Sequence, residues 1–399
     1  MTNDSQTAGG QVTTKVRQAL NVHALADWMG KQPELRSILS DDTSSFEPSH
    51  LTVRQFGFGQ SNPTYLVRIH GYPLVLRKKP LKVAHASAHA LHREFRILKA
   101  LRQHNLSHDA QTHNRQVPVP QVYAYCKDET VLGAEFYLME FVEGRIFTDP
   151  SLPNMTRAER TAAFHNVLTC LANLHAVDYP SVGLESYGHE GFYVQRQIDR
   201  LMQVSRKQAE LSSCPPLPQL DDIALQLSRA AKRCPHHVSL LHGDFKIDNL
   251  VFHPTEPRVI AVLDWELSTI GDPLCDVANL CMMYFMPQAQ ESNYGIAGIA
   301  GSNLQTLGIP DRFQLLQEYC DCNPANIPLQ EAMEWSGFYL AFLFFKNCVI
   351  VQGVAQRAKA GVASSAIANR VASLLPTIIE ITLKILREYP PPSTQSSRL

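Results

Sequence analysis

Three polar residues with a fixed spacing constrain this chain more than any other feature. Asp244 is followed by Asn249 five residues later and by Asp264 a further fifteen residues on. A carboxylate can take the proton of a hydroxyl group, whereas an amide and a second carboxylate supply the hard oxygen ligands that Mg²⁺ prefers. Asp and Asn are also common in surface turns, so the interpretation rests on the whole set. The spacing predicts phosphoryl transfer from ATP, with Asp244 as base and with Mg²⁺ bound by Asn249 and Asp264.

The composition favours a folded chain with one large core or two smaller ones. The chain has 399 residues, of which 45% are hydrophobic and 18% are charged. A formal net charge of −1 gives no field that would attract nucleic acid. Nine scattered cysteines indicate free thiols rather than a disulfide framework. The longest apolar stretch, 338–351, carries Lys346 and Asn347 in its middle, so we expect a core helix and no membrane span.

The two ends of the chain carry different signals. Residues 1–14 are polar and contain Asp4, so we expect neither a secretory nor a mitochondrial presequence. Ser397-Arg398-Leu399 resembles the Ser-Lys-Leu address that a peroxisomal import receptor reads. A frayed polar tail is the alternative. The tripeptide predicts a peroxisomal protein, and without it the expectation is a cytoplasmic one.

The order of periodic segments predicts an α+β chain. A leading helix is expected at 21–39, a helix at 85–103, and five strands at 51–56, 64–70, 74–77, 121–126 and 135–142. Short strands at 239–241, 250–252 and 259–263 surround the 242–249 motif. Further helices are expected at 157–175, 194–211, 222–233, 273–284, 312–319, 329–356 and 363–387.

This order matches the bilobal plan of protein kinases. We expect an extension with the leading helix over 1–49, and a small five-stranded lobe that binds nucleotide over 50–142. A mostly helical lobe with the catalytic and acceptor sites follows over 143–389, and a flexible tail over 390–399. The nucleotide is expected between the lobes.

Longer stretches around the motif carry a family resemblance. With His242-Gly243-Asp244 before Asn249, and Gly271-Asp272-Pro273 before Asp276, the chain resembles the aminoglycoside phosphotransferase family of small-molecule kinases. The stretches 75–80, 242–255 and 263–274 are most similar to the amino-terminal kinase domain of two-domain acyl-CoA dehydrogenases. Those proteins are implicated in phosphorylating 4-hydroxyacyl-CoA, so the resemblance implies a hydroxyacyl-CoA as acceptor.

The resemblance also assigns supporting roles near the motif. His242 is expected to be buried and to tie backbone groups together. Asp276 is expected to bond the backbone of the catalytic loop, although it could also favour a helix N-terminus. Asp272, before Pro273, is expected in a turn or a helix cap.

The small lobe holds the predicted nucleotide contacts. Gly57, Gly59, Ser61 and Asn62 lie between two strands, where backbone N–H groups can approach phosphates, although an ordinary hairpin turn has the same composition. Arg77 stands where kinases place a lysine, with Lys78 as the alternative phosphate-binding cation. Glu94 is the expected partner of Arg77. Met139 is expected to line the adenine pocket, and the backbones of Glu140 and Val142 to read the adenine edge.

The acceptor site is expected on the last long helices. Lys346 and Arg357 are eleven residues apart and share a helix face among apolar side chains. This pattern suits an acyl chain on a phosphorylated carrier, and a solvated basic face is the alternative. Two other functions remain open, namely a kinase of choline, an aminosugar or a sugar, and a nucleotide-binding regulator without catalysis.

Overall fold

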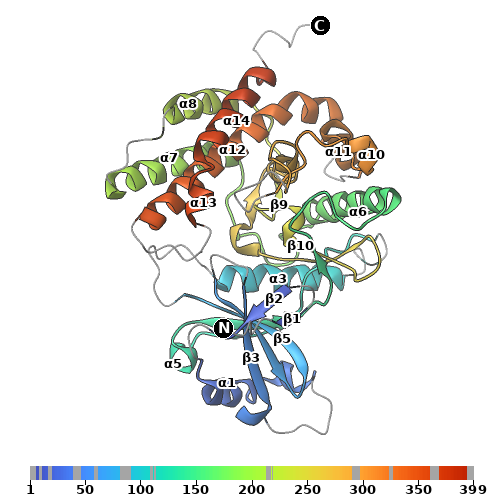
Figure 1. Ribbon diagram of the computed structural model, residues 1–399, viewed down its shortest axis with the longest axis vertical. Coiled ribbons are helices and arrows are strands. Elements are labelled where there is room, and N and C mark those ends of the chain that lie inside the picture. Colours follow the sequence, from blue (N-terminus) through green and yellow to red (C-terminus); the bar gives the residue numbers. More distant parts are fainter. Residues whose placement is uncertain are drawn as a thin grey trace. The chain divides into compact units, whose positions relative to one another are not determined.

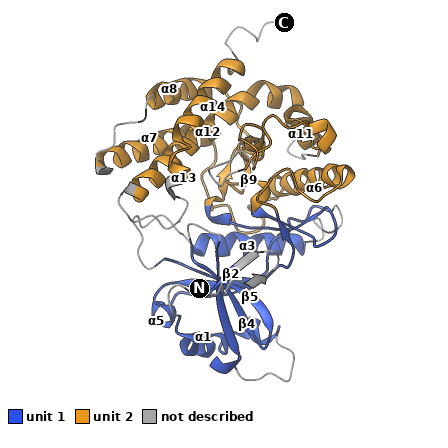
Figure 2. Cartoon of the chain, in the orientation of Figure 1, with its two compact units in different colours: residues 1–146, 249–266 blue, residues 147–248, 267–399 orange. Residues whose placement is uncertain are grey.

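The computed structural model forms two compact units. It describes residues 6–8, 11–16, 20–38, 46–57, 62–80, 91–107, 111, 114–212, 217, 219–289, 297–322, 327–359 and 368–392. Unit 1 contains residues 1–146 and 249–266, and unit 2 contains residues 147–248 and 267–399 (Figure 2). Gly59, Ser61 and Ser397-Arg398-Leu399, which the sequence singles out, lie outside the described residues.

Unit 1 is built on a seven-stranded antiparallel sheet (Figure 1). Its strand order is β1-β2-β3-β4-β5-β7-β6. The strands are β1 (Gln6–Ala8), β2 (Gln11–Thr14), β3 (Leu51–Phe56), β4 (Thr64–Ile69), β5 (Tyr72–Lys78), β6 (Val122–Cys126) and β7 (Phe136–Glu140). The five predicted strands are confirmed. The prediction missed β1 and β2 because their polar sequences show no alternation, and it left them in a separate extension.

One face of this sheet carries the core of unit 1. Leu74 and Leu76 of β5 are fully buried in a cluster with Leu25 and Met29 of α1 (Val22–Met29). The predicted helix 21–39 is shorter, because α1 ends at Gly30 and Pro33 starts the separate α2 (Pro33–Arg36). Short helical turns follow at η1 (Pro48–His50) and α5 (Glu129–Leu132).

The other face of the sheet is covered by α3 (Leu91–Asn105), which packs against β6 and β7. Side chains alternate along a strand, so Arg77 points to this face whereas Leu76 and Lys78 point away from it. The helix was predicted to begin at 85, but residues 81–90 lie outside the described part of the chain.

A second, smaller sheet attaches 249–266 to unit 1. Its order is β11 (Val259–Val262), β10 (Leu250–Phe252) and β8 (Arg145–Ile146), after η2 (Ile247–Asn249) and before η3 (Trp265–Leu267). A side chain at Gly144 would collide with the Phe252 carbonyl, so only glycine allows this pairing. The predicted boundary between the two lobes, at 142/143, therefore lies before β8, whereas unit 1 extends to residue 146. The segment 249–266 was placed with the helical lobe, but its strands pair with β8 instead.

Unit 2 is mostly helical, with one two-stranded sheet. Its helices are α6 (Arg157–His175), α7 (Tyr193–Ser212), α8 (Leu220–Ala231), α9 (Leu274–Cys281), η4 (Met282–Tyr284), α10 (Leu304–Leu307), α11 (Arg312–Cys322), α12 (Leu329–Lys359), α13 (Ala368–Ala372) and α14 (Leu375–Glu388). Strand β9 (Ser239–Leu241) pairs with β12 (Thr269–Gly271). The predicted helix 363–387 is divided into α13 and α14, and Pro376 lies in the first turn of α14.

The long helix α12 organises unit 2. It packs against α7, α9 and α14, of which α7 and α14 can be followed beside it in Figure 1. Among the described residues, it is the one helix long and apolar enough to cross a membrane, yet 72% of its most apolar window is buried in the protein. It therefore has the burial of a core helix, as the charged and amide side chains in its middle predict.

Candidate functional site

The residues predicted to bind nucleotide centre on Arg77 in unit 1. One Nη atom lies 2.9 Å from Glu94 of α3, and the other lies 3.1 Å from Asp264. The side chains of Arg77 and Glu94 are 10% and 2% exposed, so this is a buried bridge. Burial by itself would lower the pKa of Arg77, but the charges of Glu94 and Asp264 raise it above its usual range. The guanidinium therefore stays charged and holds both carboxylates.

Because side chains alternate along β5, the two predicted cations, Arg77 and Lys78, lie on opposite faces of the sheet. Arg77 shares a face with Val75 and with Met139 and Tyr137 of β7, which are their cross-strand partners. Lys78 lies on the opposite face, where burial lowers its pKa. The ion pair with Glu94 is present at Arg77, as the sequence predicts, and not one residue later.

The two residues predicted to bind Mg²⁺, Asn249 and Asp264, also lie in unit 1. The Leu263 N–H donates to the carbonyl of Asn249 at 2.9 Å, which places the segments of Asn249 and Asp264 side by side. Asp264 has a φ of 66°, a left-handed conformation that is uncommon outside glycine and found at functional sites. Its carboxylate is 39% exposed. Among the described residues, no group of three or more His, Cys, Asp or Glu side chains could hold a metal ion. One amide and one carboxylate fit Mg²⁺, which takes most of its oxygens from phosphates and water.

Two buried polar atoms in this part of unit 1 have no hydrogen-bond partner among the described residues. They are Arg77 Nε and Asn62 Oδ1, whereas the side chains of Glu94 and Tyr137 bond each other. Buried polar atoms are seldom left unpaired in a purely structural cluster, so each calls for an explanation. Their concentration here fits a site that binds a polar ligand.

The remaining predicted nucleotide contacts lie next to β3 and β4, or in β7 and directly after it. Gly57 is exposed directly after β3, and Asn62 is buried, with its amide 3.3 Å from Glu266. Met139 is buried on the Arg77 face, and Val142 is partly exposed. The Glu140 N–H already donates to the Gln121 carbonyl at 2.8 Å, so an adenine would have to use the Glu140 carbonyl.

The loop with the predicted base belongs to unit 2, where a buried carboxylate holds it in place. Asp276 Oδ2 accepts from the His242 N–H at 2.7 Å, and Oδ1 accepts from the Gly243 N–H at 2.8 Å. His242 is fully buried, and its Nδ1 accepts from the Asp244 N–H at 3.2 Å. These are the contacts that the family resemblance implies. Gly243 has a φ of 84° and touches the Leu267 backbone, so a side chain there would be strained.

A second layer of side chains surrounds Asp276. His175 Nε2 lies 3.4 Å from Oδ2, and His175 Nδ1 lies 2.8 Å from the hydroxyl of Tyr319. Burial by itself would raise the pKa of Asp276, but His175, His242 and the bonded loop amide lower it overall. Asp276 therefore acts as an ionised acceptor inside the protein.

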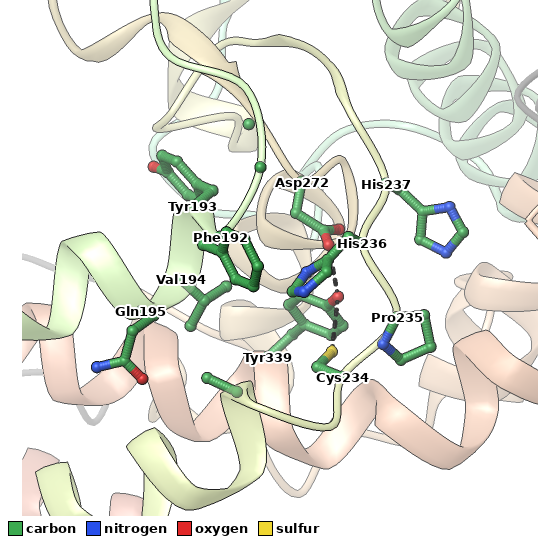
Figure 3. Close-up of a pocket in the computed structure, with 13 residues that line it drawn as sticks. Phe192, Tyr193, Val194, Gln195, Cys234, Pro235, His236, His237, Asp272 and Tyr339 are labelled. Carbon is green, nitrogen blue, oxygen red and sulfur yellow. Dashed lines mark hydrogen bonds between the residues drawn. The ribbon is translucent and has the colours of Figure 1, made fainter.

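Asp272 lies in the turn before the helix that carries Asp276, as one of the two predicted roles requires. Its Oδ1 accepts from the Leu274 N–H at 3.1 Å. Its Oδ2 accepts from the hydroxyl of Tyr339 at 2.7 Å, and that hydroxyl lies 3.2 Å from Cys234 Sγ (Figure 3). Burial raises the pKa of Asp272 to about 6, although the bonds to Tyr339 and Leu274 oppose the shift.

Two lysines contact the catalytic loop. Lys246 Nζ lies 3.5 Å from Asp244 and 3.1 Å from Asp248. Lys346 Nζ donates to the carbonyl of Gly243 at 2.8 Å, so α12 braces the loop. Arg357, the other predicted acceptor contact, is exposed farther along the same helix.

Four of these residues have no role that the sequence alone predicts. Lys246 stands inside the motif, two residues after Asp244, and its position was a usable signal. His175, Tyr319 and Tyr339 come from helices far along the chain, and nothing in their local sequence separates them from ordinary core residues.

Known proteins are similar to this chain in sequence and in fold. The sequence pattern of the phosphotransferase enzyme family, APH, matches residues 52–310. Acyl-CoA dehydrogenase family member 10 from Mus musculus is 37% identical over 375 residues, which are 92% of this chain and 33% of that protein. The curated relatives, including rat Acyl-CoA dehydrogenase family member 11 with 45% of its length covered, are thus matched over less than half of their length.

Solved structures bear out the predicted fold class. A Ralstonia eutropha protein, provisionally named an aminoglycoside phosphotransferase, is 36% identical with a TM-score of 0.71, over 93% of this chain and 99% of its own. Choline kinase from Cryptosporidium parvum has a TM-score of 0.60 at 14% identity, over 91% of this chain and 96% of its own, so the likeness is one of fold. The α+β, kinase-like prediction is confirmed.

Proposed function

This chain belongs to the phosphotransferase enzyme family, and we propose that it transfers the γ-phosphoryl group of ATP to a hydroxyl group of a hydroxyacyl-CoA. The observation that carries phosphoryl transfer is the bridge from Arg77 to Glu94 and Asp264. In kinases, a cation–glutamate pair and a metal-binding aspartate must both be in place before transfer. Here one guanidinium holds both, because its rigid fork can donate to two carboxylates at once.

In the proposed reaction, the acceptor oxygen forms a bond to the γ-phosphorus while the bond from that phosphorus to the bridging oxygen breaks and ADP leaves. Asp244 orients the acceptor hydroxyl and takes its proton late, because a loose transition state needs little help from a base. Lys246 Nζ lies 3.5 Å from Asp244 and places a positive charge beside the acceptor site. Asp276 holds the loop amides and Lys346 holds the Gly243 carbonyl, so the base is positioned before the acceptor arrives.

Asn249 and Asp264 would hold Mg²⁺, which supplies positive charge against the phosphate oxygens. The role of Arg77 is to fix the Asp264 side chain while its own charge stays near the nucleotide phosphates. The unpaired Arg77 Nε and Asn62 Oδ1 are suited to nucleotide or ordered water.

The proposed acceptor rests on the relatives and on the cations of α12. The relatives are named as acyl-CoA dehydrogenase family members, and this chain matches them over less than half of their length. Eleven residues separate Lys346 from Arg357, which is about 16 Å along an α-helix. An extended acyl chain on a phosphorylated carrier can cover that distance, whereas choline or one aminosugar cannot. Lys346 has two further N–H groups besides the one that bonds Gly243.

An acceptor screen with purified protein tests this proposal. ATP and Mg²⁺ are supplied with a 4-hydroxyacyl-CoA, choline, ethanolamine, an aminoglycoside or a hexose, and ADP release and product mass are measured. The same acyl-CoA without its hydroxyl group is the matched control. We expect phosphorylation of the 4-hydroxyacyl-CoA, no ADP release with the control, and loss of turnover in Asp244→Asn.

Other outcomes separate the alternatives. Phosphorylation of choline, an aminoglycoside or a hexose instead would keep the kinase and overturn the acceptor. Tight binding of ATP without ADP release for any acceptor would favour a nucleotide-binding regulator.

A further inference from the structure

Leu267 is an exposed apolar residue beside the candidate catalytic loop. It is 47% exposed at the end of η3, whereas Ser268, the next residue, is buried. Gly243, which precedes the predicted base Asp244, packs so closely against Leu267 that a Cβ added to Gly243 would lie 3.1 Å from Leu267 Cβ. An isolated exposed leucine is ordinary on a protein surface. This one contacts the residue next to the group that faces the acceptor.

Ile350 is a second exposed apolar residue near the same loop, one helical turn beyond Lys346 on α12. It is 43% exposed, although Val349 and Val351 on either side of it are buried. At about 100° per residue, Ile350 lies only about 40° around the helix axis from Lys346. Lys346 Nζ donates to the carbonyl of Gly243 at 2.8 Å. Ile350 therefore shares the helix face that reaches the catalytic loop.

The neighbouring faces of α12 pack against other helices. Gln352 Oε1 accepts from the hydroxyl of Ser205 on α7 at 2.7 Å, and Asn347 donates to Met282 Sδ of η4 at 3.3 Å. Around the helix axis, Asn347 lies about 60° to one side of Ile350, and Gln352 lies about 160° to the other. The exposed face of Ile350 thus lies between the side of α12 that packs on η4 and the side that packs on α7.

The hydrocarbon stem of Lys346 connects the two apolar residues. Its ammonium group bonds the loop carbonyl, so its four methylene groups extend from α12 to Gly243. Leu267 approaches Gly243 at the α-carbon, whereas Lys346 approaches it at the carbonyl oxygen. Ile350, the stem of Lys346 and Leu267 therefore form one apolar surface beside Asp244.

We propose that this apolar surface holds the hydrocarbon part of the acceptor and gives the protein a preference for long acyl chains. With the proposed hydroxyacyl-CoA as acceptor, on which this inference rests, a hydroxyl group at Asp244 brings its methylene groups next to Leu267 and Ile350. That contact removes apolar area from water, whereas an aminosugar would press hydroxyl and ammonium groups against the same side chains.

The dependence of turnover on chain length tests the proposal. The full chain is supplied with ATP, Mg²⁺ and either 4-hydroxypentanoyl-CoA or 4-hydroxydecanoyl-CoA, and kcat/KM is measured for each. Both substrates carry a secondary hydroxyl group on C4, so they differ only by five methylene groups. Full burial of one methylene group is worth about a fourfold gain in affinity. Partial burial of five should therefore raise kcat/KM at least about tenfold for the longer substrate, mainly through a lower KM.

Two variants locate the contact. Leu267→Ser and Ile350→Ser shorten exposed side chains, so both should fold, and each should reduce the preference for the longer substrate at least about threefold. The loss should fall on 4-hydroxydecanoyl-CoA. Leu225→Ser is the matched control, because Leu225 on α8 is a similarly exposed leucine of the same unit, and it should keep the wild-type preference.

The outcomes separate this inference from the proposed function. Phosphorylation of both substrates with equal kcat/KM would keep the kinase function and overturn the role of the apolar surface. An unchanged preference in either folded variant, or a loss that is equal for both substrates, would also overturn it, since a purely structural effect does not depend on chain length. Phosphorylation of choline or a hexose, and of neither acyl-CoA, would overturn the proposed acceptor and this inference with it.

Discussion

Replacing Asp276 by asparagine tests how the catalytic loop is held. The carboxylate is fully buried, and each of its oxygens accepts one loop N–H, from His242 at 2.7 Å and from Gly243 at 2.8 Å. Asparagine has the same shape but only one acceptor. Its NH₂ group must therefore face one of the two amide donors, so that one buried N–H loses its partner.

The size of the effect follows from these contacts. One unsatisfied buried donor costs about 1–3 kcal/mol, and the other bond loses its charge assistance, so we expect about 2–4 kcal/mol of lost stability. For a unit of this size the melting temperature should fall by about 5–12 °C. Turnover should fall by about 10- to 100-fold, because Asp244 is no longer held in position.

The pH dependence has a definite sign. The pKa of Asp276 is lower in the folded protein than in the unfolded chain. Its stabilising contribution is therefore complete above the unfolded carboxyl pKa of about 3.9, and it is lost as the pH falls through the folded pKa. The stability difference between the wild type and Asp276→Asn should be constant near neutrality and should shrink in acid.

Thermal unfolding followed by circular dichroism and steady-state ADP release measure the two effects. Asp221→Asn is the matched control, because it makes the same chemical change at an exposed side chain, and it should stay within about 0.5 kcal/mol of the wild type. A folded Asp276→Asn that melts and turns over like Asp221→Asn would refute the claim that this carboxylate holds the loop.

Three further predictions concern the chemistry of the site. Asp244→Asn should keep ATP binding and lower kcat by about 100-fold or more in the acceptor assay, and full turnover would exclude Asp244 as the base. In a nucleotide titration, Arg77→Ala should raise the Kd for ATP by about tenfold or more and Lys78→Ala by less than about threefold, and the reverse order would contradict the strand register. Since burial raises the pKa of Asp272 to about 6, its contribution to stability is greatest below about pH 4 and is lost as the pH rises through 6. Urea unfolding should therefore show Asp272→Asn gaining on the wild type by up to about 3 kcal/mol between pH 4 and 7, and a gap that does not change with pH would contradict the shifted pKa.

The sequence by itself determined the class of the fold and the chemical groups of the site. Strand alternation and helix periodicity act over a few residues, so the five central strands and most helices could be predicted. The spacing of Asp244, Asn249 and Asp264 likewise belongs to one short stretch of chain. Strands β1 and β2 were not predicted, because their polar sequences lack the alternation of apolar and polar residues.

The tertiary structure decided which side chains meet. Arg77 rather than Lys78 faces Glu94, because Leu74 and Leu76 turn the opposite face of β5 towards the core. Lys346 bonds the carbonyl of Gly243 across 103 residues of sequence, and Asp276 meets His175 across 101. Such contacts, like the raised pKa of Asp272 under Tyr339, depend on how distant helices pack. Local sequence determines the conformation of a segment. It does not determine which distant side chain packs against that segment.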